Sequence, residues 1–244
     1  MTIKETIKSI LFKTMGDPSL WRLIEFPKML KYLDPKMNES ILDIACGTGE
    51  LTLKIANHGC ESYGIDLSPD AINQSKKNSD REGIRCDFQI ANAENLPFSN
   101  GQFDKVISNC ALEHFQNDIK ALEEMNRVLK ENGELVLSVD SFSYPINQEL
   151  KRKHSLTYNV VNYYTKESIQ KKLIKADFEL QESDYIINSK LSSTFFNYLY
   201  LKNENQYILV ILSIIAYPFC FISDKLFGSN QQGYGLVLKS KKIS

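Results

Sequence analysis

The sequence lacks several features that mark special classes of protein. Its 244 residues carry 29 Lys and Arg against 30 Asp and Glu, so there is no basic excess for holding nucleic acid through its phosphates. The five cysteines are widely spaced and form no Cys-x-x-Cys pair, so neither a disulfide framework nor a zinc site is expected. Lys4 and Glu5 interrupt any apolar run at the N-terminus, so no secretory signal is expected. A cytoplasmic protein with free thiols and no nucleic-acid partner is the simplest interpretation.

Long apolar runs are also scarce, with one exception. Residues 205–223 carry no charge, and the stretch from Tyr207 to Cys220 is almost wholly apolar. A membrane span needs about 20 apolar residues. Pro218 and the polar start of this stretch shorten it, so its length is borderline.

What the sequence does contain, from residue 41 onward, is an alternation of short apolar runs with amphipathic segments of helical length. This alternation predicts an α/β fold, a doubly wound Rossmann-like sheet with helices on both faces. The seven expected strands are 41–45, 61–66, 86–91, 105–109, 134–139, 178–187 and 234–240. The expected helices are 3–12, 20–33, 50–57, 69–79, 118–130 and 165–176.

A glycine-rich turn follows the first expected strand. It contains Gly47 and Gly49, and Asp66 closes the second strand 17 residues after Gly49. A carboxylate at that place in a doubly wound sheet can hold both hydroxyls of a ribose. The third glycine of the dinucleotide fingerprint is missing, and Glu50 would lie unfavourably against a pyrophosphate. A nucleoside cofactor without phosphates is therefore favoured, and a dehydrogenase is a distant alternative.

Four segments resemble, in order, the motifs of class I S-adenosylmethionine-dependent methyltransferases of the small-molecule type. They are ILDIACGTGELT, YGIDLSPDAI, ANAENLPFSNGQFDKVIS and ALEHFQNDIKALEEMNRVLKENGELVLSV, which together cover residues 41–139. Residues 164–178 resemble a late helix of that family more loosely. The resemblance implies an enzyme that transfers a methyl group from S-adenosyl-L-methionine to a small molecule. A non-catalytic nucleoside-binding protein of the same fold is the alternative.

The resemblance also implies which residues contact the cofactor. The residues at the matching positions are Asp43, Gly47, Gly49 and Asn109 for the methionine end, Asp66 for the ribose, and Leu67, Asn92 and Ala93 for the adenine. Ala45 is a further expected cofactor contact. Asn92 stands where the family usually has an acidic residue, but its side-chain oxygen can still accept a hydrogen bond.

Three residues are candidates for a catalytic base, namely His114, His154 and Tyr164. Methyl transfer needs a base only where the acceptor must lose a proton. Ordinary packing or capping is the competing interpretation for each of them. No metal is expected, because Cys110 stands where metal-binding relatives carry a glutamate.

The resemblance and the expected elements divide the chain into three parts. Residues 1–40 would form an N-terminal helical cap, and residues 41–187 with 234–244 would form the cofactor-binding core. Residues 188–233 would form an apolar helical insertion before an antiparallel last strand, on the substrate side of the sheet.

Three roles compete for the insertion. A lid over the acceptor or a contact between subunits comes first. Peripheral docking to a membrane, giving access to a lipid-like acceptor, comes second. The apolar stripe Ile3, Ile7, Ile10 and Leu11 could assist it, or could equally be ordinary core packing. A true membrane span comes third.

Overall fold

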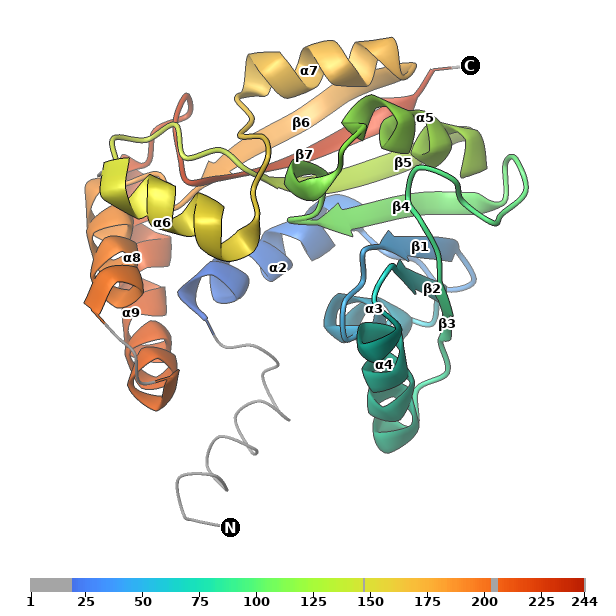
Figure 1. Ribbon diagram of the computed structural model, residues 1–244, viewed down its shortest axis with the longest axis horizontal. Coiled ribbons are helices and arrows are strands. Elements are labelled where there is room, and N and C mark those ends of the chain that lie inside the picture. Colours follow the sequence, from blue (N-terminus) through green and yellow to red (C-terminus); the bar gives the residue numbers. More distant parts are fainter. Residues whose placement is uncertain (1–18, 147, 203–205, 244) are drawn as a thin grey trace.

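A computed structural model of the chain describes residues 19–146, 148–202 and 206–243 (Figure 1). The helix expected at residues 3–12, with its apolar stripe, lies outside these ranges. The strands are β1 (Ser40–Ile44), β2 (Glu61–Asp66), β3 (Asp87–Ile90), β4 (Phe103–Asn109), β5 (Leu129–Asp140), β6 (Phe178–Ile186) and β7 (Gly235–Lys242). The helices are α2 (Leu20–Leu33), α3 (Glu50–Ala56), α4 (Pro69–Glu82), α5 (Asp118–Val128), α6 (Gln148–Tyr158), α7 (Lys166–Lys175), α8 (Lys190–Lys202) and α9 (Gln206–Phe227), with a short 3-10 helix η1 at Leu112–His114.

In the described part of the chain, seven strands form one sheet in the order β3-β2-β1-β4-β5-β7-β6. The pairs among β1 to β5 are parallel, whereas β7 runs antiparallel to both β5 and β6. The start of β7 at Gly235 lies beside Asp140, the last residue of β5. The predicted doubly wound sheet with an antiparallel last strand is therefore confirmed.

The sheet is buried on both faces. Along β5, Leu135 and Leu137 pack into one hydrophobic cluster with the helices α5 and α7, whereas Val136 packs into a second cluster with α2, α3 and α9. This alternation follows from the two-residue period of a strand. Figure 1 shows α5 and α7 on one side of β5–β7 and α2 on the other.

Local sequence signals set the helix ends. Ser68 caps α4, with its hydroxyl accepting a hydrogen bond from the Ala71 N–H at 3.2 Å, and Pro69 occupies the first turn. Thr165 and Ser168 form a reciprocal capping box at the start of α7. These signals are present in the sequence, and both helices begin where they indicate.

Two regions differ from the sequence-based expectation. The helix expected to reach residue 130 ends at Val128, because Leu129 already pairs with Phe103 and begins β5. Asn132 and Gly133, which resemble a helix end, instead lie within β5, where the register with β4 shifts. The helix α6 was not expected, because only Leu150 and His154 on it are buried and they form too short an apolar pattern to detect.

The helices α6, α8 and α9 lie together at one end of the molecule, at the left of Figure 1, beyond the carboxyl ends of β4 and β5. The helices α8 and α9 both belong to the segment between β6 and β7, as the expected helical insertion requires. By length and composition, the segment Ile208–Phe227 is long and apolar enough to cross a membrane, and 22% of its apolar window is buried.

Candidate active site

Three adjoining cavities lie at the carboxyl edge of the sheet. The first, of about 280 Å³, is lined by Asp66, Leu67 and Ala93, and the second, of similar volume, is lined by Asp43 and the glycine-rich turn. Both share Ala45. The third, of about 300 Å³, shares residues with each of the other two. The shared residues are Cys110 and His114 with the first cavity and Arg22 with the second.

The turn after β1 contacts Asp66 directly. The Gly47 N–H donates to Asp66 Oδ2 at 2.9 Å, and the Ser68 N–H donates to Asp66 Oδ1 at 2.9 Å. Gly47 has a φ of +55°, and a Cβ added there would meet nothing within 4 Å. The backbone at Gly47 is therefore open to a ligand, and the structure brings the turn and the acidic strand end together as the sequence predicts.

Asp43 is a buried carboxylate at the wall of the second cavity. It accepts a hydrogen bond from the Thr52 hydroxyl at 2.6 Å. Burial raises its pKa to about 7, against the effect of the Thr52 hydrogen bond. A buried carboxylate with a raised pKa becomes fully charged when a cation reaches it, so this position suits an ammonium group.

The predicted adenine residues lie around the first cavity with one exception. Leu67 and Ala93 line it, and Leu67 leaves 64% of its surface exposed. The Asn92 side-chain oxygen accepts from the Glu94 N–H at 2.9 Å, and Asn92 is not among the residues that line this cavity. Asn109 lines the second cavity, where its amide nitrogen lies 3.2 Å from the Met29 sulfur.

A buried cluster of acidic side chains lies at the third cavity, which Glu113 and Asp140 line and behind which Glu25 contacts Arg22 and Cys110. Glu25 of α2 is fully buried, pairs with Arg22 at 2.9 Å and accepts hydrogen bonds from the Cys110 thiol, at 2.9 Å, and from the Ser138 hydroxyl. Burial would raise the pKa of Glu25, but the Arg22 guanidinium and these hydrogen bonds outweigh it and lower the pKa. Glu25 is therefore the charged member of the cluster.

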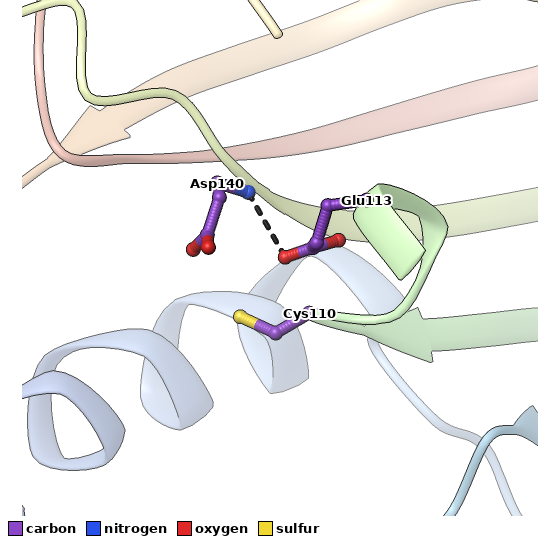
Figure 2. Close-up of side chains that lie close together, drawn as sticks. All are labelled: Cys110, Glu113 and Asp140. Carbon is purple, nitrogen blue, oxygen red and sulfur yellow. Dashed lines mark hydrogen bonds between the residues drawn. The ribbon is translucent and has the colours of Figure 1, made fainter. Parts of the chain in front are cut away.

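Glu113 and Asp140 face each other beside Cys110 (Figure 2). The Asp140 N–H donates to Glu113 Oε1 at 3.2 Å. Burial, with the Glu25 charge added, raises the pKa of Asp140 to about 8, and burial next to Asp140 raises the pKa of Glu113 well above its usual value. One ligand atom from each of Cys110, Glu113 and Asp140 lies within 4.8 Å of the others. We assign no metal there, because burial raises the pKa of the Cys110 thiol, which stays protonated beside Glu25.

The two predicted histidines both line the third cavity. His154 is buried, its Nε2 lies 3.6 Å from Asp140 Oδ2, and its Nδ1 lies 3.2 Å from the Tyr163 hydroxyl. Burial, with His114 nearby, lowers the pKa of His154 to about 4, so we take this contact as one with a neutral ring rather than an ion pair. His114 Nδ1 lies 3.3 Å from the Asn159 carbonyl oxygen.

Tyr164, the third predicted base, lies elsewhere. Its ring is fully buried, and its hydroxyl donates to Asp118 Oδ2 at 2.7 Å. Burial and that carboxylate raise its pKa. It lines none of the three cavities. The structure thus places Tyr164 as a packing residue between η1, α5 and the segment before α7.

Sequence reasoning missed Arg22, Glu25, Glu113 and Asp140. Asp140 ends a strand, LVLSVD, in the same way as Asp66 ends YGID, so the same signal was available for it. Glu25 interrupts the apolar face of α2 one turn after Trp21 and one turn before Met29, which is a weaker signal for a buried charge.

Comparisons with known proteins identify the family to which the chain is similar. The family description "Methyltransferase domain" matches residues 35–185. An uncharacterised protein of Methanocaldococcus jannaschii is 31% identical over 71% of this chain and 75% of its own length. The demethylmenaquinone methyltransferase of Paenarthrobacter aurescens is 34% identical over 54% of this chain and 49% of its own length, so the chain spans about half of that relative.

Solved structures share the fold at low sequence identity. A putative methyltransferase from Bacillus halodurans superposes with a TM-score of 0.62 at 20% identity, covering 90% of this chain and 99% of that one. Geranyl diphosphate methyltransferase in complex with S-adenosylmethionine superposes with a TM-score of 0.68 at 15% identity, covering 90% and 84%. At such identities the likeness is one of fold.

Proposed function

The chain belongs to the methyltransferase domain family and is a class I S-adenosylmethionine-dependent methyltransferase, and from that premise we propose that it methylates a small apolar molecule. One observation carries the proposal. The third cavity meets the first at Cys110 and His114, and its wall includes Trp21, Tyr158 and Phe196. An acceptor held there would lie beside the cofactor and against aromatic rings.

The residues of the first two cavities fit the cofactor. Asp43 suits the ammonium group of its methionine part, and the open backbone at Gly47 allows close approach. Asp66 presents two oxygens at the ribose position, and Leu67 offers an exposed apolar surface for the adenine. The bound cofactor supplies an electrophilic methyl group on a sulfonium. The protein then has to align the acceptor and exclude water from the site.

Helix α8 supports a lid role for the insertion at residues 188–233. Phe196 of α8 lines the third cavity and packs on Trp21 with ring centroids 5.5 Å apart. Tyr234 and Phe142 stack behind it at 5.1 Å. The insertion therefore contributes a ring to the cavity wall, as a lid over the acceptor would.

The outward face of α9 supports a peripheral membrane contact. Large apolar side chains are exposed along it with helical spacing, and we call this set the α9 stripe. Its members are Ile208, Ile211, Ile215, Phe219, Ile222 and Leu226. The opposite face, with Val210, Ala216 and Cys220, is buried. An exposed apolar stripe of this length suits a helix lying in a membrane surface, from which an apolar acceptor could enter the cavity.

Names of relatives point to the same acceptor class. Besides the demethylmenaquinone methyltransferase, ubiquinone/menaquinone biosynthesis C-methyltransferases, such as one from Citrifermentans bemidjiense at 36% identity over 40% of this chain, match it. These names describe those proteins, and for this chain they select the first acceptors to test.

The experiment is a methyl-transfer assay with S-adenosylmethionine labelled in its methyl group. Reduced demethylmenaquinone, geranyl diphosphate and a polar catechol serve as acceptors, each assayed with and without phospholipid vesicles. We expect label in an apolar acceptor and stoichiometric S-adenosylhomocysteine. Cofactor binding without S-adenosylhomocysteine from any acceptor pool would instead support a nucleoside-binding protein.

A further inference from the structure

Asp140 is placed to act on the acceptor. It ends β5 at the wall of the third cavity, and Figure 2 shows its carboxyl group and the Cys110 thiol projecting to the same side of the sheet edge. We propose that Asp140 is the general base of the reaction and that the acceptor carries a weakly acidic hydroxyl, such as a phenol. This inference rests on the proposed methyl transfer to a small molecule.

The charges around Asp140 show why it can hold a proton. Two carboxyl groups, those of Glu113 and Asp140, lie within 4.8 Å of each other in a buried site, and Arg22, which contacts the same cluster, is paired with Glu25. Two like charges at this separation and burial do not both ionise near neutral pH. The pair therefore holds at least one proton near neutral pH.

The geometry assigns to Glu113 the proton that the pair keeps when Asp140 ionises. Its side chain is fully buried, and its Oε2 atom has no hydrogen-bond partner among the described residues. An unpartnered buried oxygen is less costly in a neutral carboxyl than in a carboxylate. Asp140, beside the acceptor cavity and 3.6 Å from the neutral His154, is then the group that gains and loses a proton.

Several elements present titratable or charged groups to Asp140. They are Arg22 and Glu25 of α2, Cys110 after β4, Glu113 and His114 of η1, His154 of α6, and Tyr163 before α7. Burial and the Glu25 charge raise the pKa of Asp140 to about 8, and Arg22 acts in the opposite direction. A base with that pKa matches a phenolic hydroxyl, whose usual pKa is about 10, better than an ordinary carboxylate does.

The step balances without a further reactant. The acceptor O–H bond breaks, and its proton passes to a carboxylate oxygen of Asp140. The electron pair left on the acceptor forms the new bond to the methyl carbon, either from the oxygen or from a ring carbon made nucleophilic by the ionised oxygen. The methyl–sulfur bond breaks with its electrons retained by sulfur, which leaves an uncharged thioether in S-adenosylhomocysteine. Where a ring carbon is methylated, its hydrogen then leaves as a proton to water and the oxygen regains a proton from Asp140, which restores the aromatic hydroxyl.

The first test needs neither acceptor nor cofactor. Carbon-13 NMR of the protein labelled at its Asp carboxyl groups should show one resonance with a midpoint near pH 8 that is missing in Asp140→Asn. Spectra of Asp43→Asn identify the other raised Asp resonance. A resonance of Asp140 that titrates below pH 6 would overturn the proposal, whichever acceptor the enzyme uses.

The second test measures turnover with reduced demethylmenaquinone. We expect kcat to rise about tenfold from pH 7 to pH 9, as a group with a pKa near 8 loses its proton. Asp140→Asn should lose about 10²–10⁴-fold in kcat, with S-adenosylhomocysteine affinity kept within threefold. The matched control is Asp104→Asn, the same change near the amino end of β4, on the edge of the sheet away from the cavities. This variant should retain wild-type kcat.

Two further results would overturn the assignment. One is an Asp140→Asn enzyme that folds, binds S-adenosylhomocysteine and keeps a kcat within threefold of wild type. The other is activity that is lost with a chelator and restored by a divalent cation, because the two carboxylates would then hold a metal rather than a proton. If no acceptor is methylated while the Asp140 resonance still titrates near pH 8, the proposed function fails and the acid–base site stands.

Discussion

At the scale of single residues, the backbone is strained at the carboxyl edge of the sheet. Ala45, Cys110, Phe142 and Ile187 follow β1, β4, β5 and β6, and each has a φ between 45° and 58°. Non-glycine residues rarely adopt this left-handed conformation, and a β-branched residue such as Ile187 does so least of all. Such strain concentrates at functional sites. Two of these residues, Ala45 and Cys110, line the cavities.

The two glycines of the first turn give a matched pair of substitutions. A Cβ at Gly49 would lie 2.8 Å from the Phe88 ring at a φ of +80°, so Gly49→Ala should lower the free energy of unfolding by about 2–4 kcal/mol through strain and overpacking. Gly47→Ala meets no clash and should cost about 1–2 kcal/mol from its left-handed backbone alone. Urea unfolding of both variants measures the difference, and equal losses would show that the Phe88 contact does not restrict Gly49.

Asp43 predicts a pH dependence of cofactor binding. Its ammonium-binding form is the carboxylate, and burial raises its pKa to about 7, so lowering the pH through 7 adds a proton that binding must remove. S-adenosylhomocysteine should therefore bind about tenfold more weakly at pH 6 than at pH 8. Calorimetry at several pH values checks this, with 5′-methylthioadenosine, which lacks the amino-acid part, as the control that should not respond. The same slope for both ligands would refute the assignment.

The residue scale also shows what the sequence could predict about the site. Asp66 can be predicted because its spacing from a glycine-rich turn forms part of a sequence motif. Asp43 can be predicted because it precedes that turn. Asp140 carries the same strand-end signal but belongs to no short motif, and Glu113 and Glu25 meet it only through contacts between η1, α2 and β5. The raised pKa values of Asp140 and Glu113 and the lowered pKa of Glu25 arise from those contacts and from burial. Neither can be read from a single sequence.

At the scale of elements, local signals predicted most helices and strands. Helix α2 spans the expected residues 20–33, and β2 spans the expected 61–66. The failures have physical causes. Asn132-Gly133 resembles a helix end but lies within an irregular β5, and α6 buries too few residues to show a periodic pattern.

Helix α9 carries the prediction that belongs to this scale. If the α9 stripe docks to a membrane, the double substitution Ile215→Ser and Phe219→Ser should weaken binding to phospholipid vesicles at least tenfold, because two large apolar side chains no longer enter the interface. Vesicle flotation measures this, and Ile174→Ser on the exposed face of α7 is the control that should bind as wild type does.

Other outcomes distinguish the remaining roles of α9. Wild-type protein that does not float with vesicles and forms a dimer in light scattering, dissociated by the double substitution, would make the stripe a contact between subunits. A monomer that does not float would leave only the lid role.

At the scale of the whole molecule, the cofactor cavities join elements that are far apart in the chain. Strands β1, β2 and β4 provide the edge, and α2, which precedes β1 in the chain, lines the second cavity. Strand β7, which follows the insertion, completes the sheet by pairing with both β5 and β6. Because folding of the entire sheet creates these cavities, cofactor binding should be linked to global stability.

This linkage gives a prediction for the intact protein. S-adenosylhomocysteine at about 100 times its Kd should add about 2.7 kcal/mol to the free energy of unfolding, which corresponds to a rise in Tm of about 5–10 °C for a chain of this size. Thermal unfolding by circular dichroism checks this, with adenosine diphosphate as a control ligand. A larger rise with adenosine diphosphate would indicate a phosphate-binding site instead.

The central claim is that the turn after β1 and the carboxylate at the end of β2 hold one S-adenosylmethionine. Titration calorimetry of the folded protein with S-adenosylmethionine and S-adenosylhomocysteine tests it most directly. The same titrations are made with Asp66→Ala and with the control Asp87→Ala, at the amino end of β3 and therefore at the other edge of the sheet. We predict one site per chain for both ligands, affinity about 10–100-fold weaker in Asp66→Ala through lost charge-assisted hydrogen bonds, and unchanged affinity in Asp87→Ala. Absence of binding heat with both ligands across several temperatures, or full affinity in Asp66→Ala, would contradict it.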